Sequence, residues 1–81
     1  MLEVKVSSRT TKWIEVYPDD KTNEGGFYCE IYDDPLAQKG NCEDVFTIDK
    51  RNISPTIKDK NERRAKALAY ARNRVLERYK R

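Results

Sequence analysis

Residues 61–81, NERRAKALAYARNRVLERYKR, carry the clearest periodic pattern in the chain. Apolar residues recur there at spacings of three and four, which is typical of a helix with one face turned to a core. The residues of this predicted core face are Ala65, Leu68, Ala69, Val75, Leu76 and Tyr79. The pattern predicts a helix that ends near residue 80. Its start is either at Ser54-Pro55 or later, at Asp59 or Asn61 followed by Glu62.

Four short segments upstream of the helix have the composition of β-strands. The first alternates apolar and charged residues, and the others are rich in β-branched and aromatic residues. A polar loop that ends at Lys12 separates the first two segments, and stretches rich in Pro, Gly, Asn and Asp separate the others and predict turns. The predicted strands are residues 2–8, 13–17, 27–32 and 43–48.

The alternation within these segments assigns side chains to the two faces of a sheet. In the third segment we expect Phe27, Cys29 and Ile31 to face the core, so that Tyr28, Glu30 and Tyr32 point the other way. In the second segment the outward set is either Trp13, Glu15 and Tyr17 or the alternates Ile14 and Val16.

Together these elements predict one domain, residues 1–81, of the α+β class. We expect a small three- to four-stranded antiparallel sheet with one C-terminal amphipathic helix packed on one face. The second face of the sheet would then stay uncovered. An aromatic patch there would indicate a binding surface or a homodimer interface, although the favoured explanation is that some aromatic side chains fold over the sheet edge as ordinary packing.

Composition narrows the classes of function. The chain has 81 residues, no histidine, two cysteines and no apolar run of the ~20 residues that span a bilayer. We therefore expect no membrane association, no metal site and no cofactor, and, since no secretory signal is visible at the start, a cytoplasmic protein. Without imidazole and with little room for a pocket, we do not expect an enzyme.

Cys29 and Cys42 form no CxxC pair, and we expect free thiols.

Charge is distributed unevenly along the chain. Residues 1–60 carry nine Lys/Arg and twelve Asp/Glu, a net −3, whereas residues 61–81 carry eight Lys/Arg and two Glu, a net +6. We expect a basic stripe on the helix face opposite Leu68 and Val75, which either binds an anionic partner or simply keeps the domain in solution. The residues assigned to this stripe are Arg63, Lys66, Tyr70, Arg74, Arg78 and Arg81.

Arg72 falls in the middle of the predicted apolar face. A buried guanidinium without a partner is costly, so we expect its stem to carry the charge out to solvent. The alternative is an ion pair with Glu15 or Glu30.

Two functions from different classes follow. The first, slightly favoured, is a nucleic-acid-binding accessory or regulatory protein that lays the basic helix along phosphates, with Tyr70 stacking on a base. The second is a protein-interaction module, an adaptor, inhibitor or small subunit, that docks a partner or a second copy through the sheet face or edge with Tyr28 and Tyr32.

Overall fold

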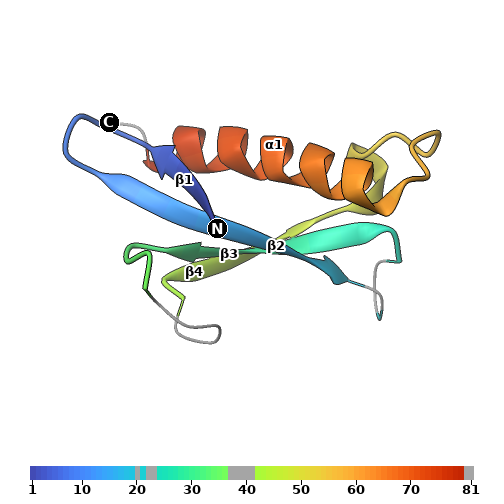
Figure 1. The fold of residues 1–81 in the computed structure, drawn as a ribbon, viewed down its shortest axis with the longest axis horizontal. Helices are drawn as coiled ribbons and strands as arrows, with labels where there is room; N and C mark the ends of the chain where they lie inside the picture. Colours follow the sequence, from blue (N-terminus) through green and yellow to red (C-terminus); the bar gives the residue numbers. More distant parts are fainter. Residues whose placement is uncertain (20, 22–23, 37–41, 80–81) are drawn as a thin grey trace.

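The computed structural model of the chain describes residues 1–19, 21, 24–36 and 42–79 and shows a four-stranded antiparallel sheet with one helix lying across one face (Figure 1). The predicted α+β fold is confirmed. The elements in chain order are β1 Leu2–Lys5, β2 Thr11–Asp19, β3 Gly26–Tyr32, β4 Asp44–Ile48, the short 3₁₀ helix η1 Lys50–Asn52 and α1 Lys60–Tyr79.

The strands follow one another in the order β1-β2-β3-β4, each antiparallel to the next. The register places Trp13 opposite Tyr32, and one face therefore carries the odd-numbered residues of β2 with the even-numbered residues of β3. Ile14 and Val16 lie on the helix side with Cys29 and Ile31. Of the two alternatives for the second strand, the outward set Trp13, Glu15 and Tyr17 is correct, although the carboxylate of Glu15 bends back to contact Arg64 of α1.

Two strand lengths differ from the prediction. β1 ends at Lys5 rather than residue 8, because the backbone amides of Val6 and Ser7 donate to the Thr10 carbonyl at 3.0 and 3.2 Å and close a turn. β2 runs from Thr11 to Asp19 and passes through Pro18, where the sequence predicts a stop. Proline is tolerated there because β1 pairing ends at Leu2 opposite Ile14, which leaves the end of β2 with a neighbour on one side only.

On two stretches of free edge, at the end of β2 and on β4, backbone donors that another strand would need are already engaged or absent. On β2 the Val16 amide donates to its neighbour Glu15 Oε1 at 3.1 Å, and Pro18, which faces the same edge, has no N–H. On the edge strand β4 the Val45 amide donates to Asp44 Oδ1 at 2.8 Å. Capped amides and proline are the devices by which natural sheets prevent strand addition.

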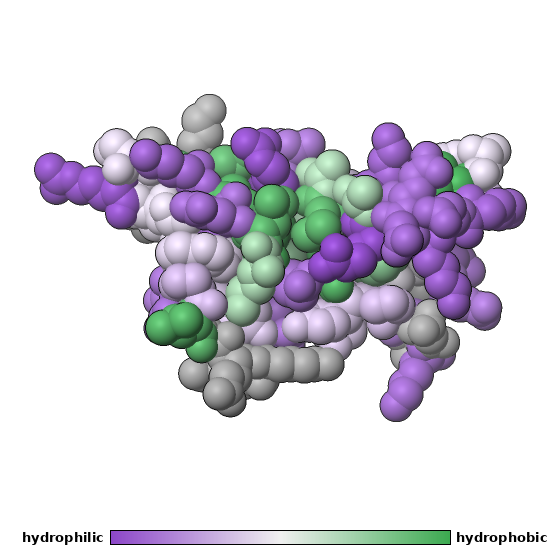
Figure 2. Space-filling model, in the orientation of Figure 1, coloured by the Kyte–Doolittle hydropathy of each residue, from purple (hydrophilic) through white to green (hydrophobic). Residues whose placement is uncertain are grey.

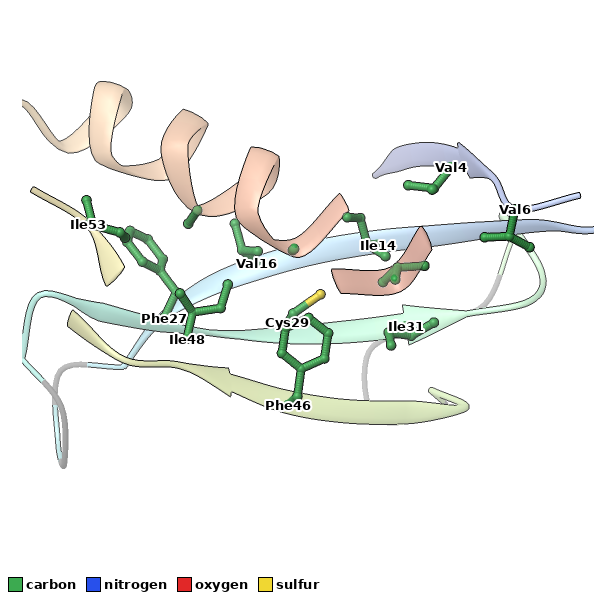
Figure 3. Packing of buried hydrophobic residues seen from close by; sticks show 13 residues of the cluster. Val4, Val6, Ile14, Val16, Phe27, Cys29, Ile31, Phe46, Ile48 and Ile53 are labelled. Carbon is green, nitrogen blue, oxygen red and sulfur yellow. The ribbon is translucent and has the colours of Figure 1, made fainter. Parts of the chain in front are cut away.

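The core lies between the sheet and α1, as Figure 3 shows for the labelled strand residues. The fully buried helix residues are Ala67, Ala71 and Val75, so the helix approaches the sheet through two methyl groups and one isopropyl group. The predicted core face is therefore partly wrong. Ala65 and Ala69 are exposed, while Leu68, Leu76 and Tyr79 pack at the margin.

The helix begins late, at Lys60, which confirms the second of the two predicted starts. Asp59 caps it, since its carboxylate accepts the Glu62 amide at 2.9 Å and its carbonyl accepts the Arg63 amide at 2.9 Å. Ser54-Pro55 forms a separate turn instead, in which the Ile57 amide donates to the Ser54 carbonyl at 3.2 Å. Among the described residues, no helix is long and apolar enough to cross a membrane.

Both cysteines are free thiols, as predicted, but they differ in access. Burial, followed by the charges of Glu15 and Glu30, raises the pKa of Cys29 from 9.0 to about 12. We expect Ellman's reagent at pH 8 to label the half-exposed Cys42 promptly and Cys29 only after urea is added. Two thiols reacting at equal rates in the native protein would contradict the buried position of Cys29.

The raised pKa of Cys29 makes the free energy of unfolding depend on pH. Above 9.0 the unfolded chain loses the Cys29 proton before the folded chain does, so this contribution to the free energy of unfolding is present below pH 9 and is lost toward pH 12. A Cys29→Ala variant should lose less stability than the wild type over that interval in urea titrations.

Candidate functional site

Arg63, assigned to the basic stripe, is a structural clamp. Its Nη1 donates to the carbonyls of Ser54 at 3.1 Å and Ile57 at 2.9 Å, and its Nη2 donates to the Gly25 carbonyl at 2.6 Å. The guanidinium thus ties α1 to the turn between β2 and β3 and to the segment that precedes the helix. Gly25 suits that turn because its φ of 90° is one that side-chain-bearing residues rarely adopt.

Replacing Arg63 by alanine should lower the free energy of unfolding by about 1–3 kcal/mol, since three carbonyls lose a charged donor. Arg72→Ala is the matched control, because Arg72 is exposed on the same helix. This variant should change the free energy of unfolding by less than about 0.5 kcal/mol. Urea denaturation measures both. Equal stabilities for the two variants would show that the clamp contributes nothing.

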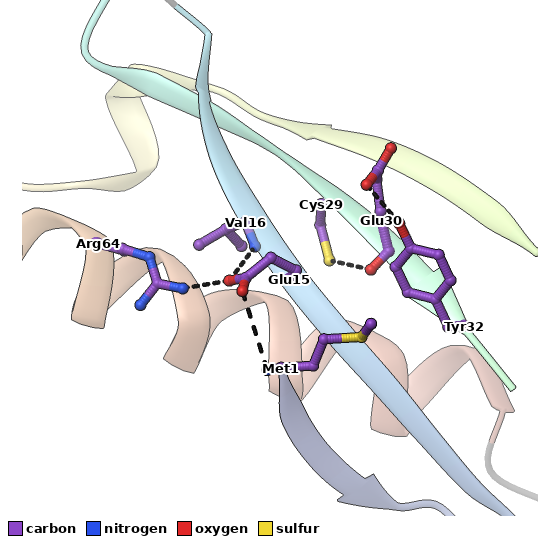
Figure 4. Close-up of polar contacts among 7 residues, drawn as sticks. All are labelled: Met1, Glu15, Val16, Cys29, Glu30, Tyr32 and Arg64. Carbon is purple, nitrogen blue, oxygen red and sulfur yellow. Dashed lines mark hydrogen bonds and ion pairs between the residues drawn. The ribbon is translucent and has the colours of Figure 1, made fainter. Parts of the chain in front are cut away.

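Three more helix cations make contacts within the domain. Arg78 forms an ion pair with Asp44 of β4, and the Arg74 guanidinium lies 4.8 Å from the centre of the Phe46 ring. Arg64, which the sequence analysis left unassigned, forms an ion pair with Glu15 (Figure 4). Arg72 is exposed, which confirms the favoured of its two predicted placements.

The expected stripe opposite the core is therefore wrong in placement. Arg63, Arg74 and Arg78 each lie three or four residues from one of the buried residues Ala67, Ala71 and Val75, so helical geometry puts them beside the core. Tyr70 is half-buried and packs against the core as well. Lys66 is exposed, and Arg81 lies outside the described residues.

A groove gathers cations from other elements. Lys50, Arg51, Lys58 and Arg63 line an open depression of about 810 Å³ together with one acid, Glu24. Its apolar lining comes from the segment before the helix and consists of Ile53, Pro55 and Ile57. Sequence analysis missed this site because its cations are dispersed among residues 50–63, and only the adjacent Lys50-Arg51 pair gave a local signal.

The face of the sheet turned away from α1 carries aromatic residues. Tyr17 and Tyr28 face each other across β2 and β3 and stack, with ring centres 5.2 Å apart and an interplanar angle of 27°. Trp13 lies further along β2, and all three are half-buried. Val45 and Thr47 of β4 continue this face and are exposed. We call Trp13, Tyr17, Tyr28, Val45 and Thr47 the aromatic face.

Tyr32 lies on the same side but was wrongly expected at the surface. It is 1% exposed, and its hydroxyl donates to Glu30 Oε1 at 2.6 Å (Figure 4). Burial, followed by this hydrogen bond and the Glu30 charge, raises the pKa of Tyr32. Tyr32 therefore supports the aromatic face from within, whereas Tyr28 forms part of its surface.

Lys12, expected in a polar loop, is instead a buried residue of β2. Its Nζ lies 2.7 and 2.9 Å from the two carboxylate oxygens of Glu43 and 4.8 Å from the centre of the Tyr79 ring. Burial, followed by the Glu43 charge, raises the pKa of Tyr79. This cluster joins the end of α1 to the sheet, and so it is structural.

An apolar area also appears in the centre of the view in Figure 2, over β1 and the adjoining part of α1. Met1 and Leu2 are exposed, as are Ala65 and Ala69 of the helix.

Within the described part of the chain, no group of three or more His, Cys, Asp or Glu residues is placed to hold a metal ion. The chain matches no protein-family model, and neither a curated protein nor a solved structure is significantly similar to it.

Proposed function

We propose that the protein is a non-enzymatic binding protein that docks a protein partner on the aromatic face of its sheet. The observation that carries this proposal is that α1 lies on one face while half-buried Trp13, Tyr17 and Tyr28 occupy the other. Tryptophan and tyrosine are enriched at protein interfaces because they bury large areas with few rotatable bonds.

At the end of β2 and on β4, the sheet edge favours docking on the face over strand addition. Pro18 and the capped amides of Val16 and Val45 remove donors that an added strand would need. A partner that covers the aromatic face needs none of these amides. Of the two docking modes the sequence predicts, the face mode therefore has the better support.

A phage-displayed library of random peptides tests this proposal. We expect enriched peptides that bind the wild type and lose about thirtyfold or more in affinity to a Trp13→Ala, Tyr28→Ala double variant. The matched control is a Lys66→Ala, Arg72→Ala double variant on exposed positions of α1, which should bind as the wild type does. Circular dichroism checks that both variants fold.

Two outcomes would count against docking on this face. Peptides that bind the aromatic variant as tightly as the wild type would place the site elsewhere, and a library without enrichment would remove the support for a peptide-docking surface. A mass that rises with protein concentration, and falls to monomer in the aromatic variant, would instead make the occupant a second copy of the chain.

Nucleic-acid binding is the second candidate, favoured by the groove of Lys50, Arg51, Lys58 and Arg63 and by the net +6 of residues 61–81. Phosphates could meet this groove and the exposed Lys66, although most of the helix arginines that the sequence assigned to this role already have partners in the domain.

Anisotropy of labelled random duplex DNA and single-stranded RNA at about 50 and 200 mM salt tests this candidate. About four phosphate contacts predict a loss of affinity on the order of a hundredfold between these salts. A Lys58→Glu, Lys66→Glu variant should bind more weakly than a Lys5→Glu, Arg9→Glu variant of equal net charge. If the two variants bind alike, the groove is not the site.

A further inference from the structure

Two glutamates face each other in the middle of the sheet. The register pairs Glu15 of β2 with Glu30 of β3, and the flanking pairs are Trp13 with Tyr32 and Tyr17 with Tyr28. Like charges directly opposite on neighbouring strands destabilise a sheet unless each has a partner. Of this pair only the Glu30 carboxylate lies between the two rows of aromatic rings, because the Glu15 carboxylate turns toward Arg64 of α1 (Figure 4).

Only one of the two carboxylates is neutralised within the described residues. Glu15 forms an ion pair with Arg64 and lies 4.0 Å from the N-terminal ammonium (Figure 4). Glu30 is 6% exposed and has neutral donors, the Tyr32 hydroxyl at 2.6 Å and the Tyr17 hydroxyl. In the part of the chain that the structure describes, no cation lies within ion-pair distance of Glu30.

The remaining charges on this side of the sheet are also mostly acidic. Among the described strand residues, the register places Glu3, Asp19 and Lys5 on this side with Glu30, which makes three acids and one cation once Glu15 is paired with Arg64. The domain as a whole is net +3. The described strand residues of this side thus carry a net negative charge, opposite in sign to that of the protein.

The arrangement is complementary to a cation. A carboxylate accepts up to about four hydrogen bonds, so two tyrosine hydroxyls leave acceptor capacity on Glu30. Aromatic rings attract ammonium and guanidinium groups over their faces, and Trp13, Tyr17 and Tyr28 are neighbours of Glu30 on the same side of the sheet.

We propose that the aromatic face receives a lysine or arginine side chain of a protein partner, with the cation over the aromatic rings and its charge directed to Glu30. This inference rests on the proposed docking function and specifies the chemistry of the partner. Guanidinium fits best, because its planar fork stacks on aromatic rings while it donates to a carboxylate.

Repeat octapeptides of Arg-Gly, Lys-Gly and Glu-Gly are suitable probes. We expect the Arg-Gly peptide to shift the amide resonances of β2 and β3 around Trp13 and Glu30 in ¹⁵N-labelled protein, with the Lys-Gly peptide weaker and the Glu-Gly peptide without effect there. Binding of a cationic peptide to a protein of net +3 would itself require a local acidic site.

The variant that tests the role of Glu30 is Glu30→Gln, which keeps the shape and an acceptor for Tyr32. It should weaken Arg-Gly binding about tenfold, while Glu62→Gln, the same charge change at an exposed helix position, should not. Should Glu30→Gln fail to fold, Tyr28→Leu removes a ring and leaves Glu30 in place, and it should also weaken binding.

The proposal is overturned if the Arg-Gly and Glu-Gly peptides shift the same resonances, or if Glu30→Gln binds the Arg-Gly peptide as Glu62→Gln does. If library peptides that lack lysine and arginine still need Trp13 and Tyr28 for binding, the proposal of docking on this face stands and only the proposal of a cationic partner is overturned. The two proposals therefore fail by different results.

Discussion

An Ala71→Glu variant is expected to be unfolded at room temperature. Ala71 is fully buried between α1 and the sheet, and a carboxylate there would have to be taken out of water, with the longer side chain pushing the helix off the core. We expect a loss of more than about 4 kcal/mol, against about 4–12 kcal/mol of total stability for a domain of this length. Circular dichroism and urea denaturation measure it.

Ala69→Glu is the matched control. It makes the same chemical change two residues earlier, on the exposed side of the same helix, and should alter the free energy of unfolding by less than about 0.5 kcal/mol. If Ala69→Glu unfolds the protein while Ala71→Glu does not, the helix is oriented as its apolar periodicity predicts and the observed packing is wrong.

An Ile31→Ala variant should have the second largest effect. Ile31 is fully buried in β3, an inner strand, and its truncation leaves a cavity under α1 that the close-packed surroundings fill only in part. We expect a loss of about 2–5 kcal/mol in urea denaturation.

Val45→Ala provides the comparison for Ile31→Ala. Val45 is an aliphatic residue of the adjacent strand but lies 47% exposed on the aromatic face, and its truncation should cost well under 1 kcal/mol. Equal losses at the two positions would contradict a core confined to the helix side of the sheet.

The fold could be predicted largely from periodicity. Alternation identified the strands and the inward set Phe27, Cys29 and Ile31, because a residue's side of a sheet is fixed by its parity. The orientation of the helix could not be predicted. Its buried stripe includes Ala67 and Ala71. The sequence alone does not distinguish these alanines from the exposed Ala65 and Ala69.

The candidate sites depended on contacts between distant segments. Net charge alone does not show that Arg78 meets Asp44 or that Arg63 meets Gly25, which lies 38 residues away in sequence. Tyr28 was correctly assigned to the face turned away from the helix, but the burial of Tyr32 appears only in the folded chain and the opposition of Glu15 and Glu30 only in the register. The groove of Lys50, Arg51, Lys58 and Arg63 likewise exists only when the chain is folded.

Mapping a selected library peptide onto the ¹⁵N-labelled protein by NMR tests whether the aromatic face docks a partner, since the single tryptophan, Trp13, adds an indole resonance on that face. We expect the largest shifts at the Trp13 indole and at the amides of Tyr17, Tyr28 and Glu30, with α1 residues such as Ala69 unchanged. Shifts confined to α1 and the groove around Lys58, with an unperturbed Trp13 indole, would contradict it.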